Sequence, residues 1–157
     1  MNIRATLNDL GLELPPAAKP AGSYVPFILT GNLLYLAGQL PLKDGKLILL
    51  GKIGPGAHTP DEGAAAARQC VLNALAAVDA AVGLHAVKRV IRLGAFVNSA
   101  PGFTAQPAVA NGASDLLVRI MGDAGRHVRS AVGVNELPLD AAVEIDFVFE
   151  VDTDTDR

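Results

Sequence analysis

The sequence predicts an α+β fold: a mixed β-sheet with two helices packed on one face, preceded by a short N-terminal helix. Residues 143–151 alternate apolar and polar side chains, which is typical of a strand with one buried face. Residues 61–82 are rich in alanine and carry an apolar stripe at helical spacing, and residues 106–121 repeat that spacing. Two helices of similar length are enough to cover one face of a single sheet.

The elements before the first long helix are short. Residues 2–10 form an amphipathic pattern, and the proline-rich residues 15–22 indicate an extended linker. Residues 25–30 and 33–37 are strand-like, and Gly31-Asn32 between them is typical of a hairpin turn. A turn at 43–46, a short apolar run at 47–50 and an irregular Gly- and Pro-rich loop at 51–60 follow.

The second half alternates strands with the two long helices. Thr59 or Asp61 can cap the first long helix, Pro60 suits its first turn, and Gly83 stops it. The predicted elements are a helix at 61–82, a strand at 87–97, a turn at 98–101, a helix at 106–121 with its exit at 122–125, and strands at 129–134 and 143–151.

The length of 157 residues fits one domain with a sizeable core. We predict an N-terminal helix and linker at 1–22, a single domain at 23–151, and a polar, disordered tail at 152–157. No stretch has the roughly 18 uninterrupted apolar residues that cross a bilayer. The N-terminus lacks the continuous apolar core of a signal peptide. We therefore expect a cytoplasmic protein without a membrane partner.

Composition excludes several further classes. The net charge is −3 with no cluster of Lys and Arg, so we expect no nucleic-acid partner. One cysteine, Cys70, rules out an internal disulfide framework and reads as a small core residue inside a helix. Three scattered histidines give no metal-ligand spacing. The hydrophobic fraction of 50% is consistent with a subunit that buries surface against copies of itself.

Charged side chains on the last two strands are the first candidates for a site. Glu144, Asp146 and Glu150 share one face of the last strand, and Arg129 lies on the strand that we expect to be its neighbour. Two interpretations stay open: a solvated surface salt bridge, or a site for an anion.

Other polar residues are weaker candidates for a functional site. His127 reads as a solvated strand-end residue rather than a general acid, and His58 sits in a loop that could close over a cleft. Ser99 and Ser114 have no base at readable spacing, so no nucleophilic triad is predicted.

Three motifs occur in order: Ser23-Tyr24 before the hairpin, L-A-G-Q-L-P at 36–41, and R-S-A-V-x-V-x-x-L-P at 129–138, followed by V-E-I at 143–145. Over residues 24–151 the chain resembles the YjgF/RidA family, also labelled L-PSP endoribonuclease. The resemblance implies a chorismate-mutase-like fold, homotrimers with clefts between subunits, and cofactor-free, metal-free hydrolysis of enamine or imine acids such as 2-aminoacrylate to 2-keto acids and ammonia.

The resemblance also implies roles for two charged residues. Arg129 matches an arginine that grips the substrate carboxylate, for which a guanidinium fork has the right geometry. Glu144 matches a glutamate that holds or activates the attacking water. Two interpretations of Glu144 stay open: this catalytic role, or a structural pair with Arg129.

Four further residues are implied to bind substrate. Tyr24 matches a cleft-lining tyrosine, and Gly38 matches a glycine whose backbone approaches the ligand. Asn111 matches an asparagine on the second helix. Ala131 stands where many deaminases carry a cysteine, which changes the pocket.

The sequence is consistent with three functions. The first is the enamine/imine deaminase. The second is a non-catalytic trimeric module that binds a small carboxylate as a sensor or regulator, motivated by Ala131 and by the divergent segments at 1–22 and 51–60. The third is an endoribonuclease, which the acidic balance disfavours.

Overall fold

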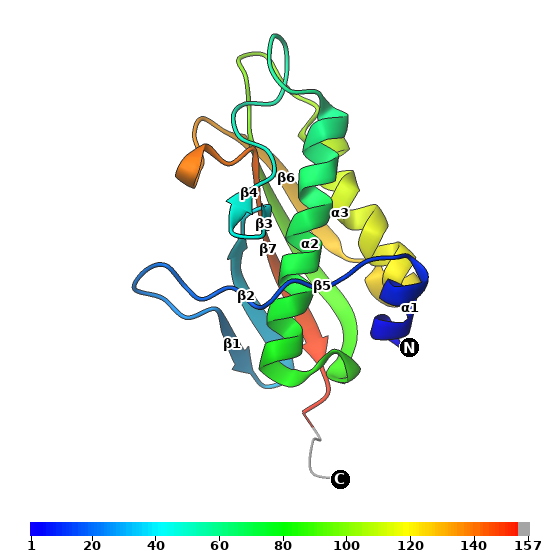
Figure 1. The fold of residues 1–157 in the computed structure, drawn as a ribbon. Coiled ribbons are helices and arrows are strands. Elements are labelled where there is room, and N and C mark those ends of the chain that lie inside the picture. Colours follow the sequence, from blue (N-terminus) through cyan, green and yellow to red (C-terminus); the bar gives the residue numbers. More distant parts are fainter. Residues whose placement is uncertain (154–157) are drawn as a thin grey trace.

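The computed structural model describes residues 1–153, so most of the predicted tail at 152–157 lies outside the described residues. A five-stranded mixed sheet has the order β1-β2-β7-β5-β6 (Figure 1). Its neighbouring strands are antiparallel except β5 and β6, which are parallel. The strands are β1 (Phe27–Thr30), β2 (Leu33–Gln39), β5 (Val87–Asn98), β6 (Val128–Val134) and β7 (Val143–Val151), with a separate hairpin of β3 (Leu42–Lys43) and β4 (Lys46–Leu47).

Two long helices cover one face of this sheet, as predicted. α2 packs on β2 and β7, α3 packs on β5 and β6, and the two helices pack on each other (Figure 1). Phe147, Phe149, Leu34 and Leu93 are fully buried beneath them. The helices are α1 (Ile3–Asp9), α2 (Pro60–Val82) and α3 (Gln106–Met121), with 3-10 turns η1 (Leu84–Ala86), η2 (Gly122–Gly125) and η3 (Pro138–Asp140).

The start of α2 follows from its capping residues. The Thr59 side chain accepts from the Glu62 N–H while the Glu62 carboxylate accepts from the Thr59 N–H, which is a complete capping box. Gly83 ends the helix with φ 81°. Among the described residues α2 is the one helix long and apolar enough to span a bilayer, and 61% of that window is buried inside the protein. Such burial is expected of a core helix.

The N-terminal segment belongs to the same core. Ile3 and Leu7 of α1 are buried against α3 and η1, and Arg4 forms an ion pair of 2.6 Å with Asp79 of α2. The chain then crosses α2 on its way to β1 (Figure 1).

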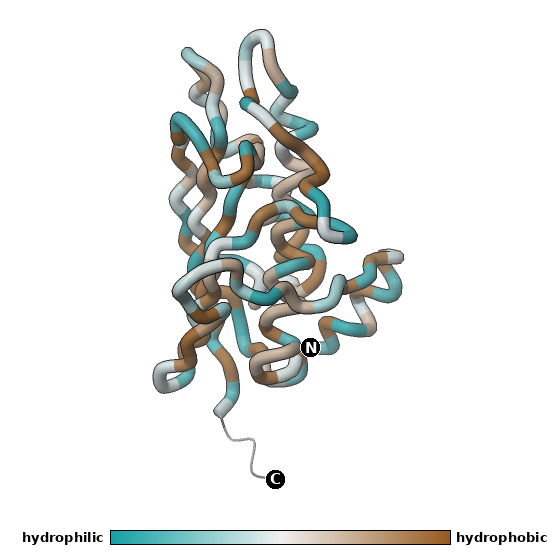
Figure 2. The backbone as a smooth tube through the Cα atoms, turned by 60° about the vertical axis from the view of Figure 1, so that its left-hand side comes forward, coloured by the Kyte–Doolittle hydropathy of each residue, from teal (hydrophilic) through white to brown (hydrophobic). Residues whose placement is uncertain are grey.

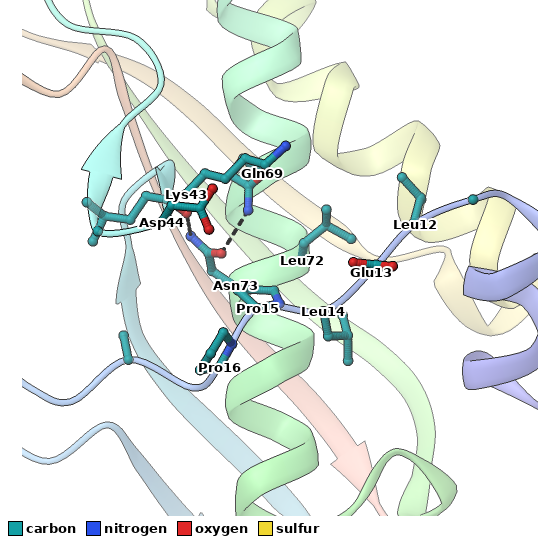
Figure 3. A pocket seen from close by; sticks show the side chains of 14 residues that line it. Leu12, Glu13, Leu14, Pro15, Pro16, Lys43, Asp44, Gln69, Leu72 and Asn73 are labelled. Atoms are coloured by element: carbon teal, nitrogen blue, oxygen red, sulfur yellow. Dashed lines mark hydrogen bonds between the residues drawn. The ribbon is translucent and has the colours of Figure 1, made fainter.

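A cavity of about 650 Å³ lies between this crossing segment, the β3-β4 hairpin and α2 (Figure 3). Its polar floor is Gln69 and Asn73. The Asn73 amide donates to the carbonyl oxygens of Leu40 and Leu42, and its oxygen accepts from Gln69. Those hydrogen bonds hold the hairpin on the helix.

The opposite face of the sheet carries no helix, and hydrophobic side chains are exposed there. They alternate with buried residues along the strands, and Figure 2 shows hydrophobic residues in the strands as well as in the helices. The exposed ones on three strands are Ile28 (58%), Tyr35 (46%), Val128 (67%) and Val132 (46%).

The predicted pairing of the last two strands is wrong. β5 lies between β6 and β7, because residues 135–142 with the η3 turn carry the chain past β5 rather than through a tight hairpin. The strand predicted at 25–30 is also too long, because β1 begins at Phe27.

Candidate functional site

Arg129 is held by α3 at the edge of the sheet. Its Nη1 donates to Asn111 Oδ1 at 2.7 Å and to Ser114 Oγ at 3.1 Å. Both bonds use the same nitrogen, so they fix the plane of the guanidinium and leave the Nε–Nη2 edge for another acceptor. A carboxylate matches that edge.

Ser114 also contacts His127. The two side chains approach to 2.9 Å between Oγ and Nε2, and His127 Nδ1 lies 2.6 Å from the carbonyl oxygen of Gly125. Spacing in the sequence indicates no base near Ser114, but the fold brings His127 to it, and His127 is partly buried rather than solvated. The η2 turn brings His127 back alongside α3, thirteen residues from Ser114 along the chain. The fold brings these two side chains together, and their spacing along the sequence does not reveal the pair.

Glu144 lies on β7 beside Gly38 of β2. A Cβ added to Gly38 would overlap the Glu144 carboxylate, so a glycine is required for this approach. Burial raises the pKa of Glu144, and the negative charge of Asp146 raises it further. Within residues 1–153 Glu144 has no hydrogen bond or ion pair with another side chain, whereas Asp146 pairs with Arg92 at 3.0 Å. The carboxylate is thus poised to hold a proton or a water.

Within one protomer Glu144 does not pair with Arg129. In the register of the sheet Arg129 stands opposite Leu93, whereas Glu144 stands opposite Phe96. Positions three apart on β5 point to opposite faces. We call Arg129 with Asn111 and Ser114 the arginine half-site, and Glu144 with Gly38 the glutamate half-site.

The remaining predicted residues divide between the two faces. Ala131 stands opposite Ala95 on the arginine face and is partly buried against the core. Tyr24 is 55% exposed and, with Tyr35 and Ile28, lines an open hollow of about 500 Å³ at β1 and β2. That hollow and the glutamate half-site share strand β2.

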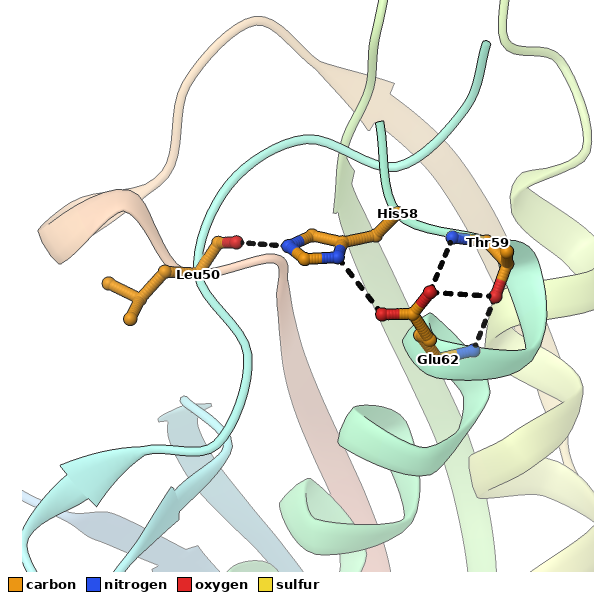
Figure 4. A network of polar contacts seen from close by, with 4 residues as sticks. All are labelled: Leu50, His58, Thr59 and Glu62. Carbon is orange, nitrogen blue, oxygen red and sulfur yellow. Dashed lines mark hydrogen bonds and ion pairs between the residues drawn. The ribbon is translucent and has the colours of Figure 1, made fainter. Parts of the chain in front are cut away.

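The loop at 51–60 is anchored rather than free to close. Ile53 is fully buried, and its N–H donates to the Asn98 carbonyl. His58 lies between the Leu50 carbonyl oxygen, 2.6 Å from Nε2, and the Glu62 carboxylate, 3.0 Å from Nδ1 (Figure 4). These bonds tie the loop to the first turn of α2.

No three His, Cys, Asp or Glu side chains gather to hold a metal ion in the part of the chain that the structure describes. Cys70 is fully buried in α2, as predicted, and burial raises the pKa of its thiol far above the usual range. A buried neutral thiol is not a nucleophile.

The fold and the two half-sites define a class of small α+β proteins with an arginine at a sheet edge. The sequence model of the family described as "YjgF/chorismate mutase-like, putative endoribonuclease" matches residues 4–151, and the chain belongs to that family.

Three relatives place the chain further. It is 48% identical over 151 residues to protein TCP17 of Trypanosoma cruzi, covering 95% of this chain and 94% of that protein. It is 45% identical to Atu1372 from Agrobacterium tumefaciens, a protein of unknown function, with a TM-score of 0.88 over 96% of this chain and 92% of the other. It is 26% identical to the YjgF gene product of E. coli, with a TM-score of 0.60 over 86% and 91% of the two chains.

Proposed function

We propose that the protein is a cofactor-free hydrolase that converts small 2-imino or enamino acids to 2-keto acids and ammonia. Membership of the YjgF family supports the reaction class. The observation that carries the proposal is the arginine half-site, where two hydrogen bonds fix one nitrogen of Arg129 and leave its other edge for a substrate carboxylate.

The active assembly in this proposal is a homotrimer whose sites lie between subunits. Arg129 and Glu144 face opposite sides of one sheet, so one protomer does not bring them to the same small substrate. A cleft between two protomers can combine the arginine half-site of one with the glutamate half-site of its neighbour. The exposed apolar residues on the uncovered face of the sheet supply a surface for association.

The chemistry needs little beyond orientation and charge. An imine carbon is already electrophilic, so the site must hold the acid group, place a water and move protons. Glu144, whose pKa is raised by burial, is suited to accept a proton from that water. Loss of ammonia from the resulting carbinolamine then leaves the 2-keto acid.

Generating 2-aminoacrylate enzymatically and following keto-acid release tests the proposal, with Arg129→Ala as the variant and Arg119→Ala as a matched control on the exposed side of α3. We expect a loss of at least about 100-fold in kcat/KM for Arg129→Ala and no change for the control. Equal rates for wild type and Arg129→Ala would remove the proposed role.

A second candidate is a non-catalytic carboxylate-binding module. Ala131 favours it, because a methyl group stands on the arginine face where a thiol is found in many deaminases. Thermal stabilisation by 2-ketobutyrate without any turnover of 2-aminoacrylate would select this alternative.

The family description also includes endoribonuclease activity, which the net charge of −3 disfavours. Cleavage of single-stranded RNA by protein free of host nucleases would support that activity.

A further inference from the structure

The hydrogen bonds around Ser114 form a chain with one possible direction. His127 Nδ1 faces a carbonyl oxygen, which only accepts, so Nδ1 carries the proton and neutral Nε2 is an acceptor. The Ser114 hydroxyl therefore donates to Nε2. It accepts in turn from Arg129 Nη1. The order of donation is Arg129, Ser114, His127 and the Gly125 carbonyl.

This arrangement leaves Ser114 with one unused lone pair. A hydroxyl oxygen accepts two hydrogen bonds, and Arg129 occupies one position. A base fixed by a third group and bonded to a hydroxyl is the arrangement of an activated serine. Here, however, the hydroxyl lies in the middle of α3 and beside the guanidinium expected to hold the substrate.

Charged groups around His127 are few. Arg129 reaches it through Ser114, and Arg126, the preceding residue, is paired with Asp123 at 3.2 Å. None of the described carboxylates bonds to the imidazole, since its two nitrogens are occupied by Ser114 and Gly125. The ring is therefore held in position by two neutral partners, with Nε2 facing the Ser114 hydroxyl.

We propose that Ser114 and His127 form a proton relay of the arginine half-site, with Ser114 as the group that touches the substrate and His127 as the proton store. The inference rests on the proposed imine hydrolysis. It places a proton-transfer group on the protomer whose Arg129 holds the substrate carboxylate, in addition to Glu144 of the neighbouring protomer.

The relay balances in three steps for a protonated imine. Water oxygen bonds to the imine carbon while the π pair of the carbon–nitrogen double bond moves to nitrogen, a water proton passes to Ser114 Oγ, and the serine proton passes to His127 Nε2. In the second step the imidazolium returns a proton through Ser114 to the carbinolamine nitrogen. In the third, the carbon–nitrogen bond breaks with its electron pair on nitrogen, the hydroxyl proton passes to Glu144 of the neighbouring protomer, and the 2-keto acid and ammonia leave. Glu144 then releases that proton to solvent.

The decisive variant is His127→Gln, because the glutamine oxygen can still accept from Ser114 but cannot store a proton. His85→Gln, on the exposed surface, is the matched control. The readouts are kcat and KM for enzymatically generated 2-aminoacrylate and, separately, the Kd of 2-ketobutyrate. We expect kcat to fall by about 100-fold, with KM and Kd within about threefold of wild type.

A second variant guards against a folding effect. His127→Ala should recover at least about tenfold of its lost kcat when free imidazole is added, as a missing base does, while Arg129→Ala should not. Wild-type kcat in His127→Gln, or loss of 2-ketobutyrate binding in that variant, overturns the relay alone. Absence of turnover in wild type overturns the proposed function and the relay with it.

Discussion

Arg129 and Glu144 lie on opposite faces of one sheet, separated by the strand that pairs with both of theirs. The consequence is a prediction about mixed oligomers. Co-expressed Arg129→Ala and Glu144→Gln subunits, each inactive alone, should assemble clefts that carry an intact half-site from each type. Random assembly of equal amounts gives about one quarter of wild-type activity.

The measurement is the rate of keto-acid formation by the whole co-expressed mixture, purified without separating assemblies of different composition. If the mixture is no more active than either single variant, Arg129 and Glu144 of a working site must come from one protomer. A mixture assembled from separately purified, non-exchanging trimers is the control and should stay inactive.

Gly38→Ala should disturb catalysis more than folding. The new Cβ displaces the end of the Glu144 side chain, which is flexible, so the cost falls on the position of the carboxylate. We expect a loss of at least about tenfold in kcat with a Tm within about 2 °C of wild type.

A double-mutant cycle checks this coupling. In the Glu144→Gln background, Gly38→Ala should have a smaller further effect on kcat, because the group that it displaces no longer takes the proton. Additive losses in the cycle would show that the glycine acts independently of Glu144.

Glu144→Gln should stabilise the protein at neutral pH. Folding raises the pKa of this carboxyl, so its ionised form costs stability. The cost is absent well below the ordinary glutamate pKa of 4.5, grows as the pH rises through the unfolded and then the folded pKa, and is constant above both. We expect Tm to rise by about 1–2 °C at pH 7, or roughly 0.5 kcal/mol for a half-buried group.

Melting curves of wild type and Glu144→Gln at equal protein concentration, from pH 4 to pH 8, test this sign. The two Tm values should converge at the acid end. A variant that is less stable than wild type at pH 7 would show that the ionised carboxylate has a favourable partner in the assembly.

Thr59→Ala should destabilise the fold by about 1 kcal/mol, because it removes the capping box of the central helix. The corresponding fall in Tm is about 2–4 °C for a chain of this size. Thermal melts give the answer, and Thr104→Ala, an exposed threonine, is the matched control. Equal losses in both variants would argue against a capping contribution.

Val132→Asp should prevent assembly. Val132 is 46% exposed on the uncovered apolar face, which would form a subunit contact in the proposed trimer, so a carboxylate there would be buried without a partner. Light scattering should change from trimer to monomer, with the secondary structure by circular dichroism unchanged. Ala65→Asp, on the exposed side of α2, should remain a trimer.

Much of this protein follows from local pattern. The alanine-rich stripe, with Thr59 or Asp61 as its cap and Gly83 as its stop, predicts α2 to within one residue, because helix ends depend on nearby side chains. Alternation over residues 143–151 predicts β7 and its buried face, and the ordered motifs at 23–24, 36–41, 129–138 and 143–145 together identify the family.

The tertiary structure decided which strands and which side chains are neighbours. Pattern shows which face of a strand is apolar but not which strand is its neighbour, so β5 between β6 and β7 was missed and an Arg129–Glu144 pair stayed open. For the same reason the contact between Ser114 and His127 was not predicted. Residues that meet because two elements pack together have no regular spacing along the chain. Contacts between elements depend on the packing of the whole core, and that information is spread over the chain rather than held in any one segment.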